Sequence, residues 1–150
     1  MTNRYHKTAL LLTLLAAFSG SSYATESESA EPSKLQPCPT SPNCVSSDSR
    51  TEQHQIAVIE PKTSLDKSWV AIVSYIQQTP RFALVEQQDN YLKAEATTLI
   101  MRFTDDVEFE KRPADNVIAV RSASRVGHSD LGANRTRVEE IRSFLSTQDQ

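Results

Sequence analysis

The chain has 150 residues, with 16 Lys and Arg against 19 Asp and Glu, a formal net charge of -3 at pH 7 and 38% hydrophobic residues. This length suits one domain of ordinary size. The acidic balance argues against general binding of nucleic acid or of anionic membranes, because both need a basic surface.

The N-terminus has the three parts of a signal peptide. Arg4 and Lys7 supply positive charge, residues 9–18 form an apolar stretch, and residues 22–24 place small side chains where a signal peptidase needs them. The apolar stretch is shorter than the roughly 20 residues that span a bilayer. No cysteine stands at the cleavage site to carry a lipid. We therefore expect residues 1–24 to be removed, leaving a periplasmic or secreted protein with no membrane span.

A polar, acidic stretch at residues 25–36 predicts a disordered leader, because it buries too little apolar surface to offset its chain entropy. One domain, residues 37–147, follows it. Cys38 and Cys44 flank a turn with two prolines, and two cysteines in an exported chain favour a disulfide. A metal site would need more ligands, so we expect no metal here.

The elements that follow predict an α+β fold. Alternating Ile56 and Val58 indicate a short strand, and apolar residues at helical spacing indicate a helix from Leu65 to the stop at Pro80, with Thr63 or Ser64 as cap. Further strands are expected at residues 81–87, 91–103, 107–111 and 117–124, with Asp105 and Asp106 on a turn, and a closing helix at residues 134–146. Short turns predict an antiparallel sheet of about four to five strands with two helices packed on one face. The opposite face must then be wet or bind something.

The segment 121–137, Arg-Ser-Ala-Ser-Arg-Val-Gly-His-Ser-Asp-Leu-Gly-Ala-Asn-Arg-Thr-Arg, is the main candidate site. With Asn134 as helix cap, Arg135 and Arg137 would occupy the first helical turn. Cations there face the positive end of the helix dipole, which is unfavourable by roughly 0.3–1 kcal/mol each. These guanidinium groups therefore need negative charge nearby.

Two sources of that charge are open. Carboxylates of the chain could form an internal clamp, and structural ion pairs are common enough to favour this source. Alternatively, a phosphate, sulfate or carboxylate ligand could bind at the helix N-terminus. In both cases the candidate residues are Asp105, Asp106, Arg121, Ser124, Arg125, His128, Asp130, Asn134 and Arg135.

Catalysis at the same segment has weaker support. His128 as base, oriented by Asp130 and paired with a nearby serine, could form a hydrolase triad, but neighbours on one loop rarely reach that geometry. The chain has no Gly-x-Ser-x-Gly elbow, no metal-binding motif and no nucleotide motif. We therefore expect no cofactor.

Three blocks of the sequence resemble the family called domain of unknown function 1499. They are Cys38-Pro39-x-Ser41-Pro42-Asn43-Cys44-Val45-Ser46-Ser47, Asp105-Asp106-Val107-Glu108-Phe109, and the run from Arg121 to Arg135. The resemblance covers about Pro37 to Phe144. It implies a protein of bacterial or plastid-related character, often exported or membrane-attached, with no activity to carry over and no catalytic residue to transfer. It also implies that the three blocks belong together.

These observations predict a small exported envelope domain that is not an enzyme. It would bind an envelope protein or an anionic small molecule near Arg121, Arg125 and Arg135. The alternatives are a hydrolase that uses His128 and Asp130, or a purely structural module.

Overall fold

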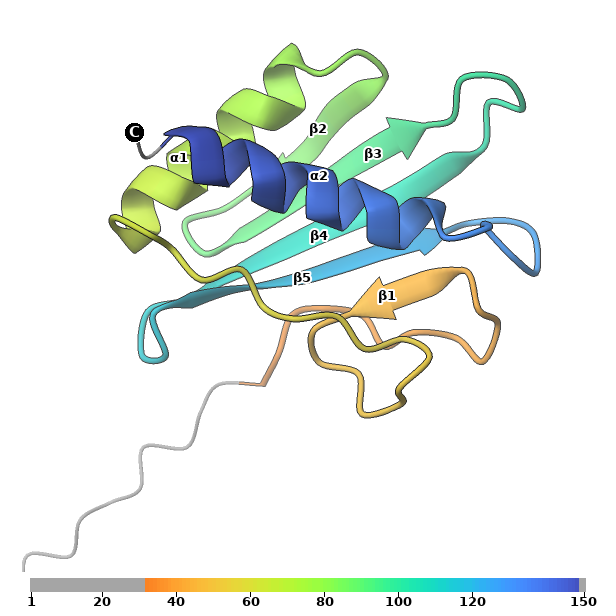
Figure 1. The fold of residues 1–150 in the computed structure, drawn as a ribbon, viewed down its shortest axis with the longest axis horizontal. Helices are drawn as coiled ribbons and strands as arrows, with labels where there is room; N and C mark the ends of the chain where they lie inside the picture. The colour runs from red at the N-terminus through yellow and green to blue at the C-terminus, as the bar shows by residue number, and fades with distance from the viewer. Residues whose placement is uncertain (1–31, 149–150) are drawn as a thin grey trace, which may run out of the picture. The chain divides into compact units, whose positions relative to one another are not determined.

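A computed structural model describes residues 32–148, so the predicted signal peptide lies outside the described residues. One antiparallel sheet has the strand order β1-β5-β4-β3-β2, and both helices cover the same face of it (Figure 1). This confirms the predicted α+β fold. The elements are β1 (Cys44–Ser46), α1 (Leu65–Gln78), β2 (Phe82–Gln87), β3 (Tyr91–Thr97), β4 (Thr104–Arg112), β5 (Val117–Ser124) and α2 (Ala133–Gln148). Within residues 32–148, no helix is long and apolar enough to cross a membrane.

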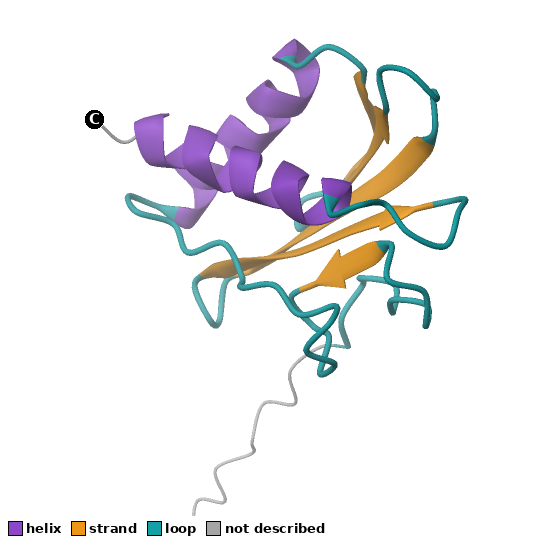
Figure 2. Cartoon of the chain, turned by 45° about the vertical axis from the view of Figure 1, so that its right-hand side comes forward, coloured by secondary structure: helices purple, strands orange, loops and turns teal. Residues whose placement is uncertain are grey.

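The main core lies between the helices and the sheet (Figure 2). Alternate residues of a strand point to opposite faces, so each central strand sends every second side chain toward the helices. The predicted helix cap is confirmed, because the Ser64 side chain accepts a hydrogen bond from the Lys67 backbone N–H at 3.2 Å. The buried core side chains are Val45, Ile56, Ile59, Trp69, Ile72, Ile76, Leu92, Ala94, Ala96, Val107, Phe109, Ile118, Val120, Val138, Ile141 and Leu145.

The opposite face of the sheet is partly covered by the end of the stretch that the sequence assigned to a disordered leader. The backbone N–H of Lys34 donates to Glu110 Oε1 at 3.1 Å, and that of Gln36 donates to Glu108 Oε2 at 3.2 Å. Leu35 is buried between them. Buried carboxylates need donors, and the extended segment supplies backbone N–H groups that a composition argument does not consider.

The long strand expected at residues 91–103 is wrong. β3 ends at Thr97, and a loop follows in which the Thr98 N–H donates to the Phe103 carbonyl at 2.8 Å. Asp105 and Asp106 do not form a turn; they lie inside β4 and pair with Ser124 and Ala123 of β5. The loop at residues 98–103 contains apolar residues that favour a strand. For this reason the sequence extended β3 too far and placed the turn at Asp105 and Asp106 instead.

The fifth strand is also not where the sequence put it. Residues 56–58 form no strand, and the residues on either side make isolated bridges, Gln55 to Ser46 and Ile59 to Ile118. Instead Cys44–Ser46 pairs with β5 at the edge of the sheet. The disulfide at Cys44 and the buried Val45 hold this short strand in place, although its neighbours are polar.

Candidate functional site

The buried side chain of Asn134, in the first turn of α2, joins that helix to the sheet. α2 begins at Ala133, so Asn134 is not the cap that the sequence predicted. Its Nδ2 donates to the Asn43 carbonyl at 3.0 Å, to Ser124 Oγ at 3.0 Å and to Asp130 Oδ2 at 2.8 Å. One fully buried amide therefore ties α2 to β5, to the turn before β1 and to the loop between β5 and α2.

The same amide continues into a buried ion pair. Asn134 Oδ1 accepts from Ser122 Oγ and from Arg137 Nη1, each at 2.7 Å. Arg137 Nη2 donates to Asp105 Oδ2 at 2.5 Å. Asp105 is only 1% exposed, and its second oxygen, Oδ1, is buried without a hydrogen-bond partner. We call these residues, Asn43, Asp105, Ser122, Ser124, Asp130, Asn134 and Arg137, the Asn134 network.

Asp130 performs the capping role that the sequence gave to Asn134. Its Oδ1 accepts from the Gly132 N–H at 3.1 Å, and its Oδ2 accepts from the Asn134 N–H at 2.8 Å. Burial alone would raise the pKa of Asp130, but the hydrogen bonds from Asn134 and Gly132 outweigh it, so the pKa is lowered. A carboxylate at this position is also favoured by the helix dipole. Asp130 therefore offsets the cations in the first turn of α2.

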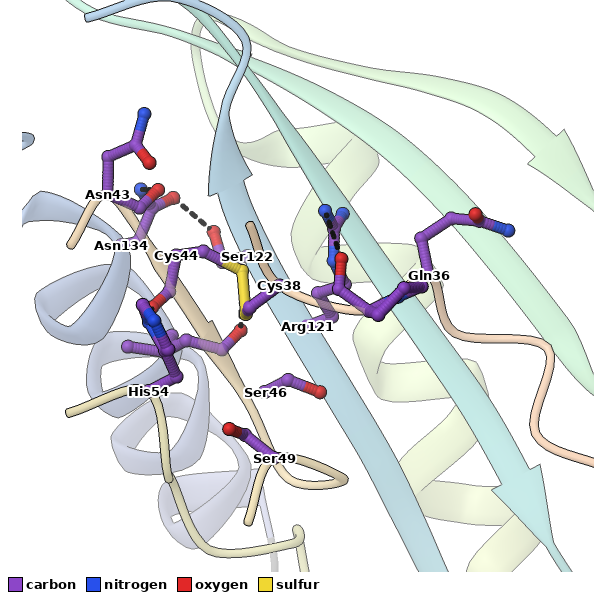
Figure 3. Close-up of a disulfide and its surroundings, with 12 residues drawn as sticks. Gln36, Cys38, Asn43, Cys44, Ser46, Ser49, His54, Arg121, Ser122 and Asn134 are labelled. Atoms are coloured by element: carbon purple, nitrogen blue, oxygen red, sulfur yellow. Dashed lines mark hydrogen bonds between the residues drawn. A yellow bond between two sulfur atoms is a disulfide. The ribbon is translucent and has the colours of Figure 1, made fainter. Parts of the chain in front are cut away.

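Arg121 lies on the other face of the sheet. Its Nη1 donates to Glu108 Oε1 at 2.7 Å, and both side chains are almost fully buried. In Figure 3 Arg121 lies beside Gln36, whereas Asn134 lies beside Ser122. Neighbouring residues of one strand point to opposite faces, so Arg121 and Ser122 cannot share a site on one face.

Arg125 forms an ion-pair cluster at the end of β5. Its Nε and Nη2 donate to the two oxygens of Asp106 at 3.0 and 2.8 Å, and Nη2 also reaches Glu95 Oε1 at 2.5 Å. The hydrogen bond from Arg125 is the main cause that holds the pKa of Asp106 below its ordinary value, and Lys93 at 3.4 Å adds to the effect. This guanidinium already has two carboxylate partners.

Arg135, which was predicted beside these groups, points elsewhere. Its Nη2 donates to the Gln55 carbonyl at 2.8 Å and lies 3.5 Å from the Gln53 carbonyl. It therefore holds an irregular segment against α2.

The predicted candidate residues do not converge on one pocket. Asp105, Ser124, Asp130 and Asn134 belong to the Asn134 network, Asp106 and Arg125 form an exposed cluster, Arg121 lies on the other face, Arg135 binds backbone carbonyls, and His128 stands in the loop. The carboxylates that meet Arg121, Arg125 and Arg137 all come from the chain itself. The charge arrangement matches an internal clamp.

The serine–histidine–aspartate combination is not assembled. None of the hydrogen bonds among residues 32–148 joins His128 to a serine or to Asp130. The hydroxyls of Ser122 and Ser124 are bound to Asn134, and Asp130 is bound to backbone N–H groups. In the same described part of the chain, no group of three or more His, Cys, Asp or Glu is placed to hold a metal ion.

The predicted disulfide between Cys38 and Cys44 is present, with a Cα–Cα distance of 5.7 Å (Figure 3). It links β1 to the segment around Lys34–Gln36, which covers part of the sheet face opposite the helices. We call this the segment that crosses the sheet. His54 is buried beside it, and its Nδ1 lies 2.9 Å from the Cys44 carbonyl. The disulfide and His54 therefore hold β1 at the edge of the sheet and pack against it.

A surface feature that the sequence analysis missed lies at the end of the sheet where β3 meets β4. Two loops there, residues 98–103 and 125–132, carry large apolar side chains that face solvent, with Ile100 86% and Leu131 97% exposed. We call this set, Leu99, Ile100, Met101, Phe103, Val126 and Leu131, the tip surface. The three consecutive apolar residues Leu99 to Met101 were visible in the sequence, but they were interpreted as the continuation of a strand.

A hollow of about 480 Å³ lies at the same end of the sheet. Its lining includes Leu99 and Leu131 of the tip surface, with Arg81 from the α1–β2 connection. Arg137 of the Asn134 network also lines it. The two loops therefore border one depression, to which each contributes one residue of the tip surface, Leu99 and Leu131.

A family model described as "Protein of unknown function (DUF1499)" matches residues 34–145. The match includes the segment that crosses the sheet, the disulfide block, the Asn134 network and the tip surface. No curated protein matches the chain.

Proposed function

The chain belongs to the DUF1499 family, whose description states no activity, and we propose that it is an exported, non-enzymatic binding module of the cell envelope. Its binding surface would be the tip surface. It includes Val126 and Leu131 of the segment 121–137, which we call the Arg-rich loop. Export through a signal peptide at residues 1–24, with a periplasmic or secreted location, is part of the proposal. The disulfide supports it, since disulfides persist mainly in oxidising compartments.

The observation that carries the proposal is the exposure of six large apolar side chains at one end of the sheet. Exposed apolar side chains that gather in one region of a folded domain commonly mark an interaction site, and these six lie on two loops at the same end of the sheet. The core of the same domain buries side chains of the same kind completely. The tip residues face solvent and do not pack into the core, so the fold does not explain why they are apolar. Binding to the surface of another molecule explains it better.

A small anionic ligand held by the Arg-rich loop is less well supported. Arg121, Arg125 and Arg137 each have a carboxylate within 2.8 Å. A ligand would have to displace one of these carboxylates, and two of them, Asp105 and Glu108, are buried. The hydrolase alternative lacks the hydrogen bonds that would orient His128, so catalysis has no geometric support.

Thiol labelling in cells tests whether the tip surface is occupied. The full-length chain carrying Ile100→Cys is expressed, and the labelling rate at this cysteine by a small maleimide in intact envelopes is compared with the rate in the purified exported protein. Val70→Cys, at an exposed apolar position of α1, is the matched control. We expect slower labelling in envelopes only at position 100. Equal rates at position 100 in both settings would overturn the proposed binding surface.

The export part of the proposal has a separate test. The intact mass of the purified exported protein should correspond to a chain that begins after Ala24, with two hydrogens fewer than the dithiol form. A mass that retains residues 1–24 would contradict cleavage.

A further inference from the structure

We infer that the tip surface docks onto a lipid bilayer whose surface carries anionic phosphate headgroups. The inference deepens the proposed function by naming what occupies the surface, and it depends on that function. It rests on three properties of this end of the molecule, namely the shape of its loops, the chemistry of their apolar residues and the cations beside them.

The shape is that of two projecting loops. Residues 98–103 join β3 to β4, and residues 125–132 join β5 to α2, and both extend beyond the strands at the same end of the sheet (Figures 1 and 2). The first loop is closed at its base, where the Phe103 N–H donates to Thr98 Oγ1 at 2.9 Å. Leu99, Ile100 and Met101 therefore stand at a tip whose own backbone is held together.

The chemistry of the tip suits the boundary between headgroups and acyl chains. Apolar side chains that enter a membrane interface lie some 5–10 Å deep, with basic groups at headgroup level. Leu, Ile and Met carry no hydrogen-bonding group that would need a partner in that layer. Phe103, which is 44% exposed, stands at the base of the loop and is less exposed than Leu99, Ile100 and Met101.

Two cations flank the apolar tip without an internal partner. Arg102 follows Met101 directly, and Arg81 lines the hollow with Leu99 and Leu131. Among residues 32–148, neither guanidinium takes part in an ion pair, unlike those of Arg121, Arg125 and Arg137. A guanidinium binds phosphate oxygens with two parallel hydrogen bonds. Arg81 and Arg102 are thus free to bind lipid phosphates.

Carboxylates also line the hollow beside Arg81. Asp130 lies in its lining, but both of its oxygens accept hydrogen bonds from the start of α2. Glu140 also contributes to the lining. Four other acids, Glu95, Asp106, Glu108 and Glu110, are held in ion pairs of the sheet. The acids of the sheet therefore already have cationic partners, whereas the hollow holds Asp130 and Glu140 together with Arg81.

A bilayer fits this surface better than a folded protein partner. Stable protein interfaces bury about 800 Å² on each side, and their strongest contacts are enriched in Trp, Tyr and Arg packed into pockets. The tip surface instead presents aliphatic side chains on two separate projections. Such projections insert into a deformable lipid layer without needing a complementary rigid surface.

Vesicle sedimentation tests the inference. The protein purified after export from its full-length precursor is mixed with vesicles of phosphatidylglycerol and phosphatidylcholine, and with vesicles of phosphatidylcholine alone. We expect partition onto the anionic vesicles to be at least tenfold greater. The variant Leu99→Ser/Ile100→Ser/Met101→Ser should lose at least tenfold of it, and Arg81→Gln/Arg102→Gln should lose the preference for anionic lipid.

The matched control is Val70→Ser/Val85→Ser, which removes two exposed apolar side chains on α1 and β2. It should partition like the wild type, and circular dichroism should give all variants the same melting profile. Equal partition of wild type and tip variant, equal partition onto both kinds of vesicle, or no partition at all would overturn the inference. A wild-type dimer in sedimentation velocity that the tip variant abolishes would replace the bilayer with a second copy.

The two proposals fail separately. If Ile100→Cys is protected from labelling in envelopes but the protein does not bind vesicles, the lipid inference is wrong and the proposed binding surface stands. Free labelling of Ile100→Cys in envelopes would remove both.

Discussion

The inner and outer sides of the Arg-rich loop contrast sharply. On the inner side, the Asn134 network satisfies nearly every polar group with a partner from the chain, and Asp105 Oδ1 is its one unpaired oxygen among the described residues. On the outer side, Val126 and Leu131 belong to the tip surface and are exposed to solvent. Polar residues in this loop therefore serve the fold, and the apolar residues are those left without an intramolecular role.

The contrast reverses a common expectation. Arginines, a histidine and serines in a glycine-containing loop suggest chemistry, and exposed aliphatic side chains usually go unnoticed. Here each arginine of the loop that was proposed to bind a ligand has a carboxylate or carbonyl partner. Residue type alone does not separate a clamp from a site; the presence of an internal partner does.

The largest expected effect comes from breaking the buried ion pair. Asp105→Ala would leave Arg137 as an uncompensated buried cation, which lowers the free energy of unfolding by roughly 3–5 kcal/mol. Urea unfolding followed by circular dichroism measures it. Arg125→Ala, in the exposed cluster, is the matched control and should lower it by only about 0.2–1 kcal/mol.

Asp105→Ala could prevent folding altogether, because a domain of this size is stable by only about 5–15 kcal/mol. Asp105→Asn keeps the shape and should lower the free energy of unfolding by about 1–3 kcal/mol. Equal, small effects for Asp105→Asn and Arg125→Ala would contradict the distinction between buried and exposed clusters.

Removal of the disulfide should have the next largest effect. Cys38→Ser/Cys44→Ser frees a small ring, and the loop-entropy relation gives a loss of about 2 kcal/mol in the free energy of unfolding. The amide hydrogens of Lys34 and Gln36, which bind Glu110 and Glu108, should also exchange faster. An unchanged urea midpoint with unchanged exchange would show that the segment stays on the sheet without its covalent link.

Asp130 links the stability of α2 to pH. Asp130→Ala should lower the free energy of unfolding by roughly 0.5–2 kcal/mol near neutral pH, as expected for a lost cap. The folded pKa of Asp130 is lowered from 3.8, so its contribution is complete above that value and is lost as the pH falls through the folded pKa. Urea midpoints of wild type and variant should converge in acid. A gap that stays constant down to pH 2 would contradict the assignment.

The smallest effect on stability is expected at the tip surface. Leu99→Ser/Ile100→Ser/Met101→Ser removes side chains that contact solvent, so the free energy of unfolding should change by no more than about 0.5 kcal/mol. Thermal unfolding followed by circular dichroism checks this. A loss of several kcal/mol would mean that the tip packs into the fold, and its exposure would no longer need a binding partner.

Much of the fold could be predicted from the sequence because its periodicities are local. Helix α1 follows from its apolar spacing, its Ser64 cap and the stop at Pro80. The sheet class follows from alternating strands with short turns. The end of β3 could not be predicted, since Leu99 to Met101 are apolar like the residues of a strand. Only the tertiary structure shows that the ladder with β4 runs no further than the pair of Thr97 and Thr104.

The candidate site was predictable in its residues and unpredictable in its connections. That Arg135 and Arg137 needed negative charge nearby followed from the helix dipole. That Arg121 and Ser122 lie on opposite faces follows from the strand predicted at residues 117–124, because neighbouring side chains of a strand alternate. The central role of Asn134 depends on Asn43, which is distant in sequence, and a single sequence carries no measure of that contact.

The most direct test of the account places an environment-sensitive fluorophore at one end of the molecule and at a control position. Ile100→Cys and Val70→Cys are each labelled with a nitrobenzoxadiazole probe and mixed with anionic vesicles, with the native disulfide left intact. The account predicts a blue shift and increased emission at position 100 and none at position 70. No change at position 100, or the same change at both positions, would contradict it.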